Sequence, residues 1–363
     1  MRVALLHPSY WPEVRRGGER LVHDVARGMA RRGHDVTVLT SHRARATTQM
    51  EEGVRVVRSY RPPTKLMHRR AYEYHLTNVP TAFARTLAGG YDVAHAFFLP
   101  DAWAAVRARA LGGPPVVYSF IGIPTREWAV AHRYRLPMAI EAVDEAAAVT
   151  VLSEAAAQPY RRFLLREPAV VPGSVSLADF AVPDTAPDAP TLVCAASLSD
   201  PRKQGPLLLR AFEVLRRTRP GARLELVGVG DPHQGALDLD LPPGAHRREL
   251  RDDAALARAY AGATASVLAS VHEAFGLVVV ESLAAGTPVA GVRSGALPEL
   301  LADDRVGALA EPGDEAGLAE AMERALALGE DPATAARCRE QAARYDEAAV
   351  LPRYEALYEE AVS

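Results

Sequence analysis

Two glutamates separated by seven residues, Glu273 and Glu281, have the spacing that most clearly suggests chemistry in this chain. They lie in the stretch SVHEAFGLVVVESLAAGTPVAG, which runs from Ser270 to Gly291. The pattern places Glu273 in a loop between a strand and a helix, and Glu281 inside that helix. The first carboxylate could accept hydrogen bonds from sugar hydroxyls, and the second from the vicinal hydroxyls of a ribose. For an isolated pair of glutamates, the simpler interpretation is an acidic helix start and an exposed charge.

The start of the same helix is a candidate anion site. Its first backbone amides have no intrahelical partner and lie at the positive end of the helix dipole, which suits phosphate groups. A glycine there lets a ligand approach the backbone closely. One short segment could therefore hold a sugar, a diphosphate and a nucleoside. The residues expected at the helix start are Phe275, Gly276, Leu277 and Val278.

The elements that must position this segment alternate between strands and helices along the chain. Such alternation predicts an α/β fold with parallel sheets covered on both faces. The strands expected before residue 172 are Val3–Leu6, Val36–Leu39, Val54–Val57, Asp92–Ala96, Val116–Ser119, Ala148–Leu152 and Ala169–Val171. Those expected after residue 190 are Thr191–Ala196, Arg223–Val227, Thr264–Ala269 and Pro288–Gly291, followed mainly by helices.

The chain organisation favours two domains. A length of 363 residues suits about two domains. The stretch from Pro172 to Pro190, rich in Pro, Ala and Asp, is the best linker candidate. We expect a Rossmann-like domain over residues 1–185 and a second over 186–345. A ligand would bind in a central cleft between them, at the carboxyl ends of the strands.

Composition excludes several classes of protein. Hydrophobic residues make up 48% and charged residues 24%, which excludes a disordered chain, a collagen-like chain and a disulfide scaffold. The two cysteines, Cys194 and Cys338, have no metal or redox spacing, and the first apolar run is too short for a signal peptide. No stretch approaches the length of a membrane helix. A cytoplasmic protein is expected, with peripheral attachment to the inner membrane face left open.

The formal charge of −3 hides a split between the two halves. Residues 1–180 carry 24 Lys and Arg against 16 Asp and Glu, a net +8; residues 181–363 carry 18 against 29, a net −11. A basic half could meet a lipid headgroup or an anionic ligand, although a solvated surface is the simpler interpretation. The densest basic run is RPPTKLMHRRAYEYH, which begins at Arg61. The basic residues of the chain are dispersed and lack the aromatic stacking platform or motif of a nucleic-acid binder, so no nucleic-acid partner is expected.

The segment EAFGLVVVESLAAGTPVAG resembles the retaining glycosyltransferases of family 4, which have the GT-B fold of two Rossmann-like domains. The following SGALPELL, Ser294 to Leu301, and VGALAEPGDEAGLAEAM, Val306 to Met322, also match this family. The resemblance implies that Glu273 binds the donor sugar and Glu281 the ribose. It further implies that a C-terminal helix, residues 346–363, returns to the first domain.

Two further segments carry the resemblance. Gly17 and Gly18 match the family's N-terminal Gly-Gly loop, which approaches the donor phosphates; the alternative is an ordinary flexible turn. Arg202 and Lys203 match the basic segment that neutralises the diphosphate and helps the nucleotide to leave. The alternative for this pair is a solvated loop, since exposed Lys and Arg are the rule.

Three positions depart from the family pattern. Ser197 stands where an arginine usually contacts the diphosphate, and Arg202 could substitute for it. Of the family's His-x-His, only His95 remains, with Phe97 at the second place; His95 is a candidate catalytic residue or, alternatively, a packed strand histidine. Ile121 replaces the histidine of a Thr-x-His. The donor half therefore matches the family better than the acceptor half.

The resemblance predicts transfer of a sugar from a nucleotide diphosphate sugar to an acceptor hydroxyl with retained anomeric configuration. The candidate catalytic residues are Glu273, Lys203 and His95. Neither a metal nor a cofactor is expected, because fixed protein charges stabilise the diphosphate. The acceptor stays open and could be anionic or lipid-linked. The alternatives are a nucleotide-sugar epimerase of the same fold, or a nucleotide- or sugar-binding protein with impaired catalysis.

Overall fold

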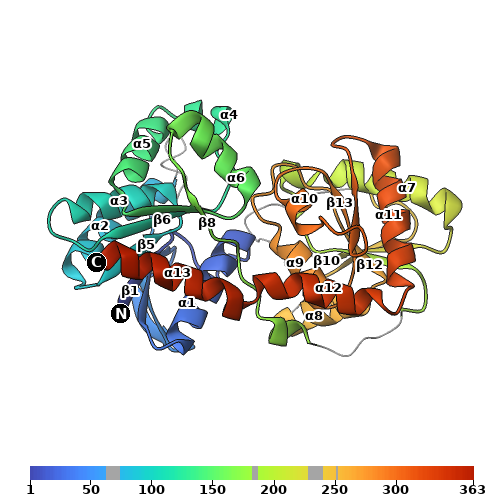
Figure 1. Cartoon of the computed structure of the whole chain (residues 1–363), viewed down its shortest axis with the longest axis horizontal. Coiled ribbons are helices and arrows are strands. Elements are labelled where there is room, and N and C mark those ends of the chain that lie inside the picture. The colour runs from blue at the N-terminus through green and yellow to red at the C-terminus, as the bar shows by residue number, and fades with distance from the viewer. Residues whose placement is uncertain (63–73, 182–186, 228–239, 251) are drawn as a thin grey trace. The chain divides into compact units, whose positions relative to one another are not determined.

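The computed structural model describes residues 1–62, 74–181, 187–227, 240–250 and 252–363. The chain divides into two compact units, Met1–Pro172 with Val350–Ser363, and Gly173–Ala349 (Figure 1). The expected domain boundary at residue 185 lies outside the described residues.

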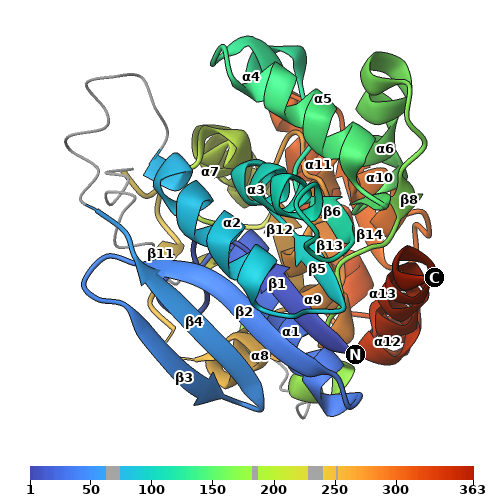
Figure 2. The ribbon, with the colours of Figure 1, turned by 90° about the vertical axis from the view of Figure 1, so that its left-hand side faces the viewer.

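Unit 1 is built on an eight-stranded sheet in the order β3-β4-β2-β1-β5-β6-β7-β8. All neighbouring strands are parallel except the β3–β4 pair, which forms the edge visible in Figure 2. The central strands are almost wholly buried, as expected for a sheet with helices on both faces. The strands are β1 (Arg2–Leu6), β2 (Asp35–His42), β3 (Thr47–Glu51), β4 (Val54–Tyr60), β5 (Val93–Ala96), β6 (Val116–Phe120), β7 (Ala148–Val151) and β8 (Ala169–Val170).

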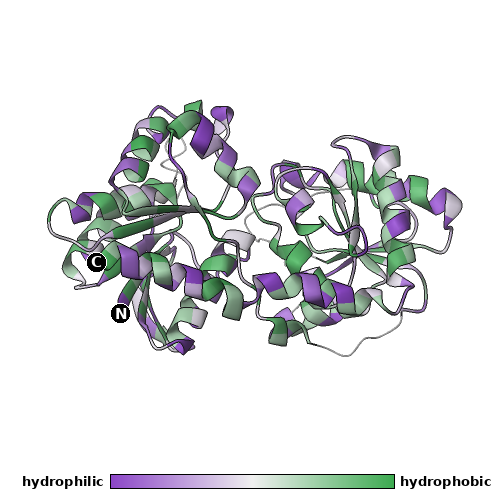
Figure 3. Cartoon of the chain, viewed as in Figure 1, coloured by the Kyte–Doolittle hydropathy of each residue, from purple (hydrophilic) through white to green (hydrophobic). Residues whose placement is uncertain are grey.

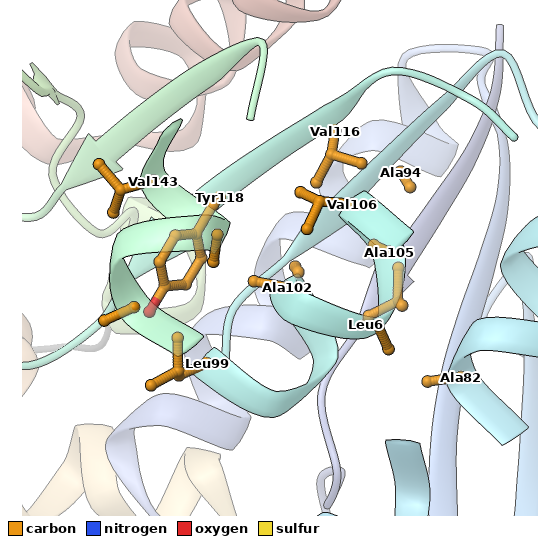
Figure 4. Close-up of a cluster of buried hydrophobic side chains, with 14 of the residues drawn as sticks. Leu6, Ala82, Ala94, Leu99, Ala102, Ala105, Val106, Val116, Tyr118 and Val143 are labelled. Atoms are coloured by element: carbon orange, nitrogen blue, oxygen red, sulfur yellow. The ribbon is translucent and has the colours of Figure 1, made fainter. Parts of the chain in front are cut away.

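The helices of unit 1 bury apolar faces against this sheet. The core beside β5 and β6 contains Leu99, Val106 and Tyr118, and Figure 4 shows them packed between α3 and the strands. The helices are α1 (Gly17–Arg31), α2 (Val79–Ala88), α3 (Leu99–Arg109), α4 (Arg126–Val130), α5 (Arg135–Glu145), α6 (Glu154–Pro159) and α13 (Glu347–Val362), of which residues from Val350 onward belong to unit 1.

Helix α13 is fixed to unit 1 by packing and by ion pairs. Tyr354 and Tyr358 are fully buried. The Glu355 carboxylate accepts hydrogen bonds from Arg32 Nε and Nη2 at 2.7 and 2.6 Å. A Cβ added to Gly28 of α1 would meet Leu351 Cδ1 at 2.4 Å, so a glycine is what allows the two helices to approach.

Unit 2 is a six-stranded parallel sheet in the order β11-β10-β9-β12-β13-β14. Its strands are β9 (Thr191–Cys194), β10 (Arg223–Val227), β11 (Ala245–Arg248), β12 (Ala265–Leu268), β13 (Val289–Val292) and β14 (Gly307–Ala310). Its helices are α7 (Gly205–Thr218), α8 (Asp253–Ala261), α9 (Leu277–Ala284), α10 (Leu297–Leu300), α11 (Glu315–Gly329) and α12 (Thr334–Ala342). Figure 3 shows apolar strands between helices of mixed polarity. The α/β prediction is confirmed in both units.

Each sheet has one point where the strand order reverses. In unit 1 it lies between β1 and β5, and in unit 2 between β9 and β12. In open parallel sheets, ligands bind at the carboxyl ends of the strands beside this point. The loops after β9 and β12 are therefore the place to search for a site in unit 2.

Candidate active site

Three polar side chains meet in the loops after β9 and β12. Lys203 Nζ donates a hydrogen bond to Glu273 Oε2 at 2.5 Å, and Ser270 Oγ donates to the same oxygen at 2.8 Å. The side chains of Lys203 and Glu273 are only 17% and 16% exposed. The fold thus brings together two residues that lie 70 positions apart in the sequence.

The Glu273 carboxylate is held in its charged form. Burial alone would raise the pKa of Glu273, but the charge of Lys203 and the hydrogen bonds from Lys203 and Ser270 outweigh it. The pKa therefore lies below its ordinary value of 4.5. A partly buried, ionised carboxylate can accept hydrogen bonds and stabilise a developing positive charge.

The start of α9 lies directly after this carboxylate. Gly276 has a φ of 91°, a left-handed conformation that glycine adopts without strain, and turns the chain into the helix that begins at Leu277. Leu277 and Val278 are half-buried, and within the described residues no side chain caps the first turn. Phe275 is buried, with its ring centroid 5.6 Å from that of Tyr345. The first amides of α9 thus offer a positive helix end beside Glu273.

Glu281 lies on the buried side of α9. It is 2% exposed, and Tyr260 of α8 donates a hydrogen bond to its Oε2 at 3.5 Å. Contact with a ribose would require this carboxylate to accept bonds from the sugar hydroxyls as well as from Tyr260. The ribose role of Glu281 stays a prediction.

Arg202 is engaged by a neighbouring acid. It lies in a short 3₁₀ helix, Pro201–Lys203, and its Nε and Nη2 donate to the two carboxylate oxygens of Asp200 at 3.2 and 2.6 Å. Ser197, at the position of the missing family arginine, lies with its Oγ 2.8 Å from Ser199 Oγ. In this position, the charge of Arg202 is partly balanced by that of Asp200. Arg202 would therefore be a weaker substitute for the missing arginine than an unpaired cation.

Gly17 and Gly18 begin α1 in unit 1, after Arg16, which provides no side-chain cap. A Cβ added to Gly17 would meet no atom within 4 Å, whereas one added to Gly18 would lie 2.6 Å from Ile121 Cδ1. Ile121, one of the departures from the family pattern, therefore packs against the glycine loop. Contact of this loop with donor phosphates stays a prediction.

His95 is enclosed in the core of unit 1. Its relative exposure is 0%, its Nδ1 lies 2.6 Å from the Tyr358 hydroxyl, and its Nε2 lies 2.7 Å from Ser119 Oγ. Phe97 stacks on its ring at 3.9 Å, and burial lowers its pKa to about 3. This geometry corresponds to the alternative interpretation, a packed histidine, because both ring nitrogens lie within hydrogen-bond distance of buried hydroxyl groups. We therefore assign His95 no part in the chemistry.

Sequence reasoning missed two residues of this site. Ser270 was not proposed as a partner of Glu273, although its place after a buried strand was a usable signal. Asp200 was not recognised as the partner of Arg202, because an acid two residues from an arginine is common in surface loops.

Across the described ranges, no group of three His, Cys, Asp or Glu could hold a metal ion. Within the same residues, no helix is long and apolar enough to cross a membrane.

Family models match both parts of the chain. A model described as Glycosyltransferase Family 4 matches residues 15–179, and one described as Glycosyl transferases group 1 matches residues 189–327. A glycogen synthase from Mycobacterium tuberculosis is 28% identical over 404 residues, covering 95% of this chain and 89% of the relative. A D-inositol 3-phosphate glycosyltransferase from Actinosynnema mirum is 28% identical over 355 residues, covering 85% and 83%.

Solved structures share the fold. A sucrose-phosphate synthase from Thermosynechococcus elongatus matches with a TM-score of 0.79 at 22% identity, over 99% of this chain and 98% of that one. Anabaena HepE, solved in complex with UDP-glucose, matches with a TM-score of 0.73 at 18% identity, over 99% and 100%. The fold of two Rossmann-like units is the GT-B fold, and the protein is a glycosyltransferase. The chain belongs to glycosyltransferase family 4.

Proposed function

We propose that this glycosyltransferase moves a sugar from a nucleotide diphosphate sugar to an acceptor hydroxyl, with the anomeric configuration retained and without a metal or cofactor. The observation that carries the proposal is the Lys203–Glu273–Ser270 cluster beside the first turn of α9. The donor class is supported by HepE, which was solved with UDP-glucose.

The chemistry follows from the two charges of the cluster. As the bond between the anomeric carbon and the phosphate oxygen breaks, Lys203 and the start of α9 stabilise the departing diphosphate. Glu273 accepts hydrogen bonds from sugar hydroxyls and stabilises the positive charge that develops on the ring. The acceptor oxygen attacks from the face that the phosphate leaves, and its proton passes to the departing phosphate oxygen. One bond to the anomeric carbon breaks, one forms, and the configuration is kept.

The test begins with the donor. A thermal-shift screen with UDP-, GDP-, ADP- and TDP-sugars identifies the nucleotide, because binding raises the melting temperature. Transfer by Glu273→Gln is then compared with that by Glu315→Gln, a matched control on α11 whose carboxylate pairs with exposed Arg210. We expect transfer to fall by at least about 100-fold in the first variant and to be unchanged in the second. Normal turnover by Glu273→Gln would refute the proposal, and loss of activity with a chelator would refute its metal-free part.

The proposal for the acceptor rests on the net charge of residues 1–180 and on the name of a related protein. Residues 1–180 carry the net positive charge, and the Actinosynnema relative is named for a phosphate-bearing inositol acceptor. We therefore propose an acceptor that carries phosphate, free in the cytoplasm or attached to a lipid at the inner membrane face. The basic run that begins at Arg61, which could meet a lipid headgroup, lies mostly outside the described residues. Comparing a phosphorylated acceptor with its unphosphorylated form tests this choice, and equal rates would contradict it.

One observation favours a second function, a donor-binding protein with impaired catalysis. Ser197 supplies no cation to the diphosphate, and Arg202 is bound to Asp200. Donor binding without transfer to any acceptor would support this alternative. Incubation with donor alone distinguishes the glycosyltransferase and the donor-binding protein from an epimerase, because an epimerase would convert the donor sugar into a different sugar on the same nucleotide.

A further inference from the structure

The loop between β13 and α10 contacts the Glu273 loop at three points. Ser294 Oγ accepts a hydrogen bond from the His272 backbone N–H at 3.0 Å, and the Ala296 N–H donates to the Glu273 carbonyl at 2.8 Å. Gly295 lies directly against the Glu273 backbone: an added Cβ would be 2.1 Å from its carbonyl oxygen and 2.7 Å from its nitrogen. These contacts involve the SGALPELL segment, to which the proposed chemistry gives no role.

The Glu273 loop needs such support because its backbone is strained. His272 has a φ of 54°, a left-handed conformation that costs free energy in a residue with a side chain. The bond to Ser294 holds the amide of this strained residue. One residue earlier, the Val271 N–H donates to the Arg202 carbonyl at 2.8 Å, next to Lys203. The two residues that precede Glu273 are thus each hydrogen-bonded to a neighbouring loop.

The supporting loop is itself firmly anchored. The Arg293 N–H donates to the Ala310 carbonyl of β14 at 2.7 Å, and Leu297 of α10 is fully buried. A Cβ added to Gly276 would lie 3.5 Å from Leu297 Cδ1, so α10 also packs against the start of α9. One rigid segment therefore contacts both the carboxylate loop and the helix end that make up the proposed site.

We propose that Ser294 and Gly295 are positioning residues that hold the Glu273 carboxylate against Lys203 and Ser270 in the geometry required for transfer. This inference rests on the proposed function of Glu273. A displacement of about 1 Å in a catalytic group can cost about 100-fold in rate. Loss of the support is therefore expected to lower kcat more than it changes the KM for the donor.

The first test compares two glycines with positive φ. Gly295→Ala introduces a methyl group against the Glu273 backbone, whereas Gly313→Ala adds one at a φ of 79° with no atom within 4 Å. Both variants carry similar backbone strain, so their difference measures the contact with Glu273. We expect Gly295→Ala to lose at least about 30-fold in kcat and Gly313→Ala less than about 3-fold.

The second test remains decisive if Gly295→Ala does not fold. Ser294→Ala removes the acceptor of the His272 N–H, and Ser294→Thr restores a hydroxyl. We expect about a 10-fold loss of kcat in the alanine variant, little change in KM or melting temperature, and recovery with threonine. Wild-type kcat in Ser294→Ala, or a loss that threonine does not rescue, would overturn the positioning role. Full activity of Glu273→Gln would instead refute the proposed function itself.

Discussion

At the scale of single residues, the site depends on an ion pair that is mostly shielded from solvent. Glu273 keeps its charge because Lys203 and Ser270 compensate for its burial. Removing one partner of such a pair leaves a charge without compensation, which costs more than the pair itself contributes. The two residues therefore have to be considered as one functional unit.

Replacing Lys203 by Met should affect both rate and pH dependence. We expect transfer to fall by about 100-fold, since the departing diphosphate loses a cation. In the wild type, the pKa of Glu273 lies below 4.5, so Glu273 should limit activity only below that pH. In Lys203→Met the pKa rises, and the acid limb of the kcat profile should move to higher pH. An unshifted acid limb would show that Lys203 does not set the charge of Glu273.

A second residue-scale prediction concerns Asp101 in unit 1. Asn78 Nδ2 donates to Asp101 Oδ1 at 2.8 Å, and Oδ2 has no hydrogen-bond partner in the part of the chain that the structure describes. Burial raises the pKa of Asp101 to about 7 from 3.8. The folded state then binds the extra proton, so this group stabilises the fold at low pH and the contribution is lost as pH rises from 3.8 to 7.

Asp101→Asn removes this titration. We expect the variant to gain stability relative to the wild type at pH 8 and to keep a smaller advantage at pH 5, as measured by urea unfolding. Asp35→Asn, at the exposed start of β2, serves as the surface control for the same substitution. A gain for Asp101→Asn that is the same at both pH values would contradict the raised pKa.

At the scale of elements, the sequence predicts the central strands well and the edge strands poorly. The range Arg223–Val227 matches β10 without change, and Val3–Leu6 matches β1 within one residue. Two edge strands were missed, β3 with the sequence TTQME and β11 with AHRR. Edge strands are held by backbone pairing while their side chains face solvent, so they need no apolar run. The edge strand β14, GALA, was missed because its small residues do not distinguish a strand from a helix.

The same physical limit applies to the site. Glu273 and the start of α9 could be predicted because the residues lie within one continuous segment. The hydrogen bonds from Lys203 to Glu273 and from the His272 N–H to Ser294 join segments that are not adjacent in the sequence, so only the fold reveals them. The enclosure of His95 beneath α13 depends likewise on a helix more than 250 residues away.

Docking of α13 on unit 1 should depend on the His95–Tyr358 contact. Tyr358→Phe leaves His95 Nδ1 buried without its partner, and we expect a loss of about 1–3 kcal/mol of unfolding free energy. Tyr60→Phe, at a position 53% exposed, is the control and should change little. Urea unfolding followed by tryptophan fluorescence measures both. Equal stabilities of the two variants would contradict a structural role for this contact.

His95 should also make the fold sensitive to acid. Its pKa falls from 6.5 to about 3 on folding, so between these values the unfolded chain binds a proton that the folded chain does not. Stability should therefore decrease as pH falls below 6.5, by up to about 1.4 kcal/mol per pH unit. His95→Gln cannot titrate and should weaken this dependence, and an unchanged slope would contradict the lowered pKa.

At the scale of the whole molecule, the candidate site for an anionic donor lies in the half of the chain that carries net negative charge. The proposed donor site lies in unit 2, yet residues 181–363 carry a net charge of −11. Overall charge therefore does not attract a diphosphate to this unit. Local groups have to do so, and the structure supplies Lys203, whose Nζ lies 2.5 Å from Glu273 Oε2, and the start of α9 at Leu277. Partly buried charges of this kind are screened by salt less than exposed ones.

The positions of the tryptophans offer a way to tell which of the two units provides most of the donor affinity. Its three tryptophans, Trp11, Trp103 and Trp128, all lie in unit 1. Tryptophan fluorescence therefore follows unfolding of unit 1, whereas circular dichroism follows both units. A nucleotide that binds mainly to unit 2 at 100 times its Kd should stabilise that unit by about 2.7 kcal/mol. We expect the circular dichroism transition of unit 2 to move to higher temperature and the fluorescence midpoint to change less. A larger shift in fluorescence would mean that the loop at Gly17 and Gly18, rather than Lys203 and α9, provides most of the nucleotide affinity.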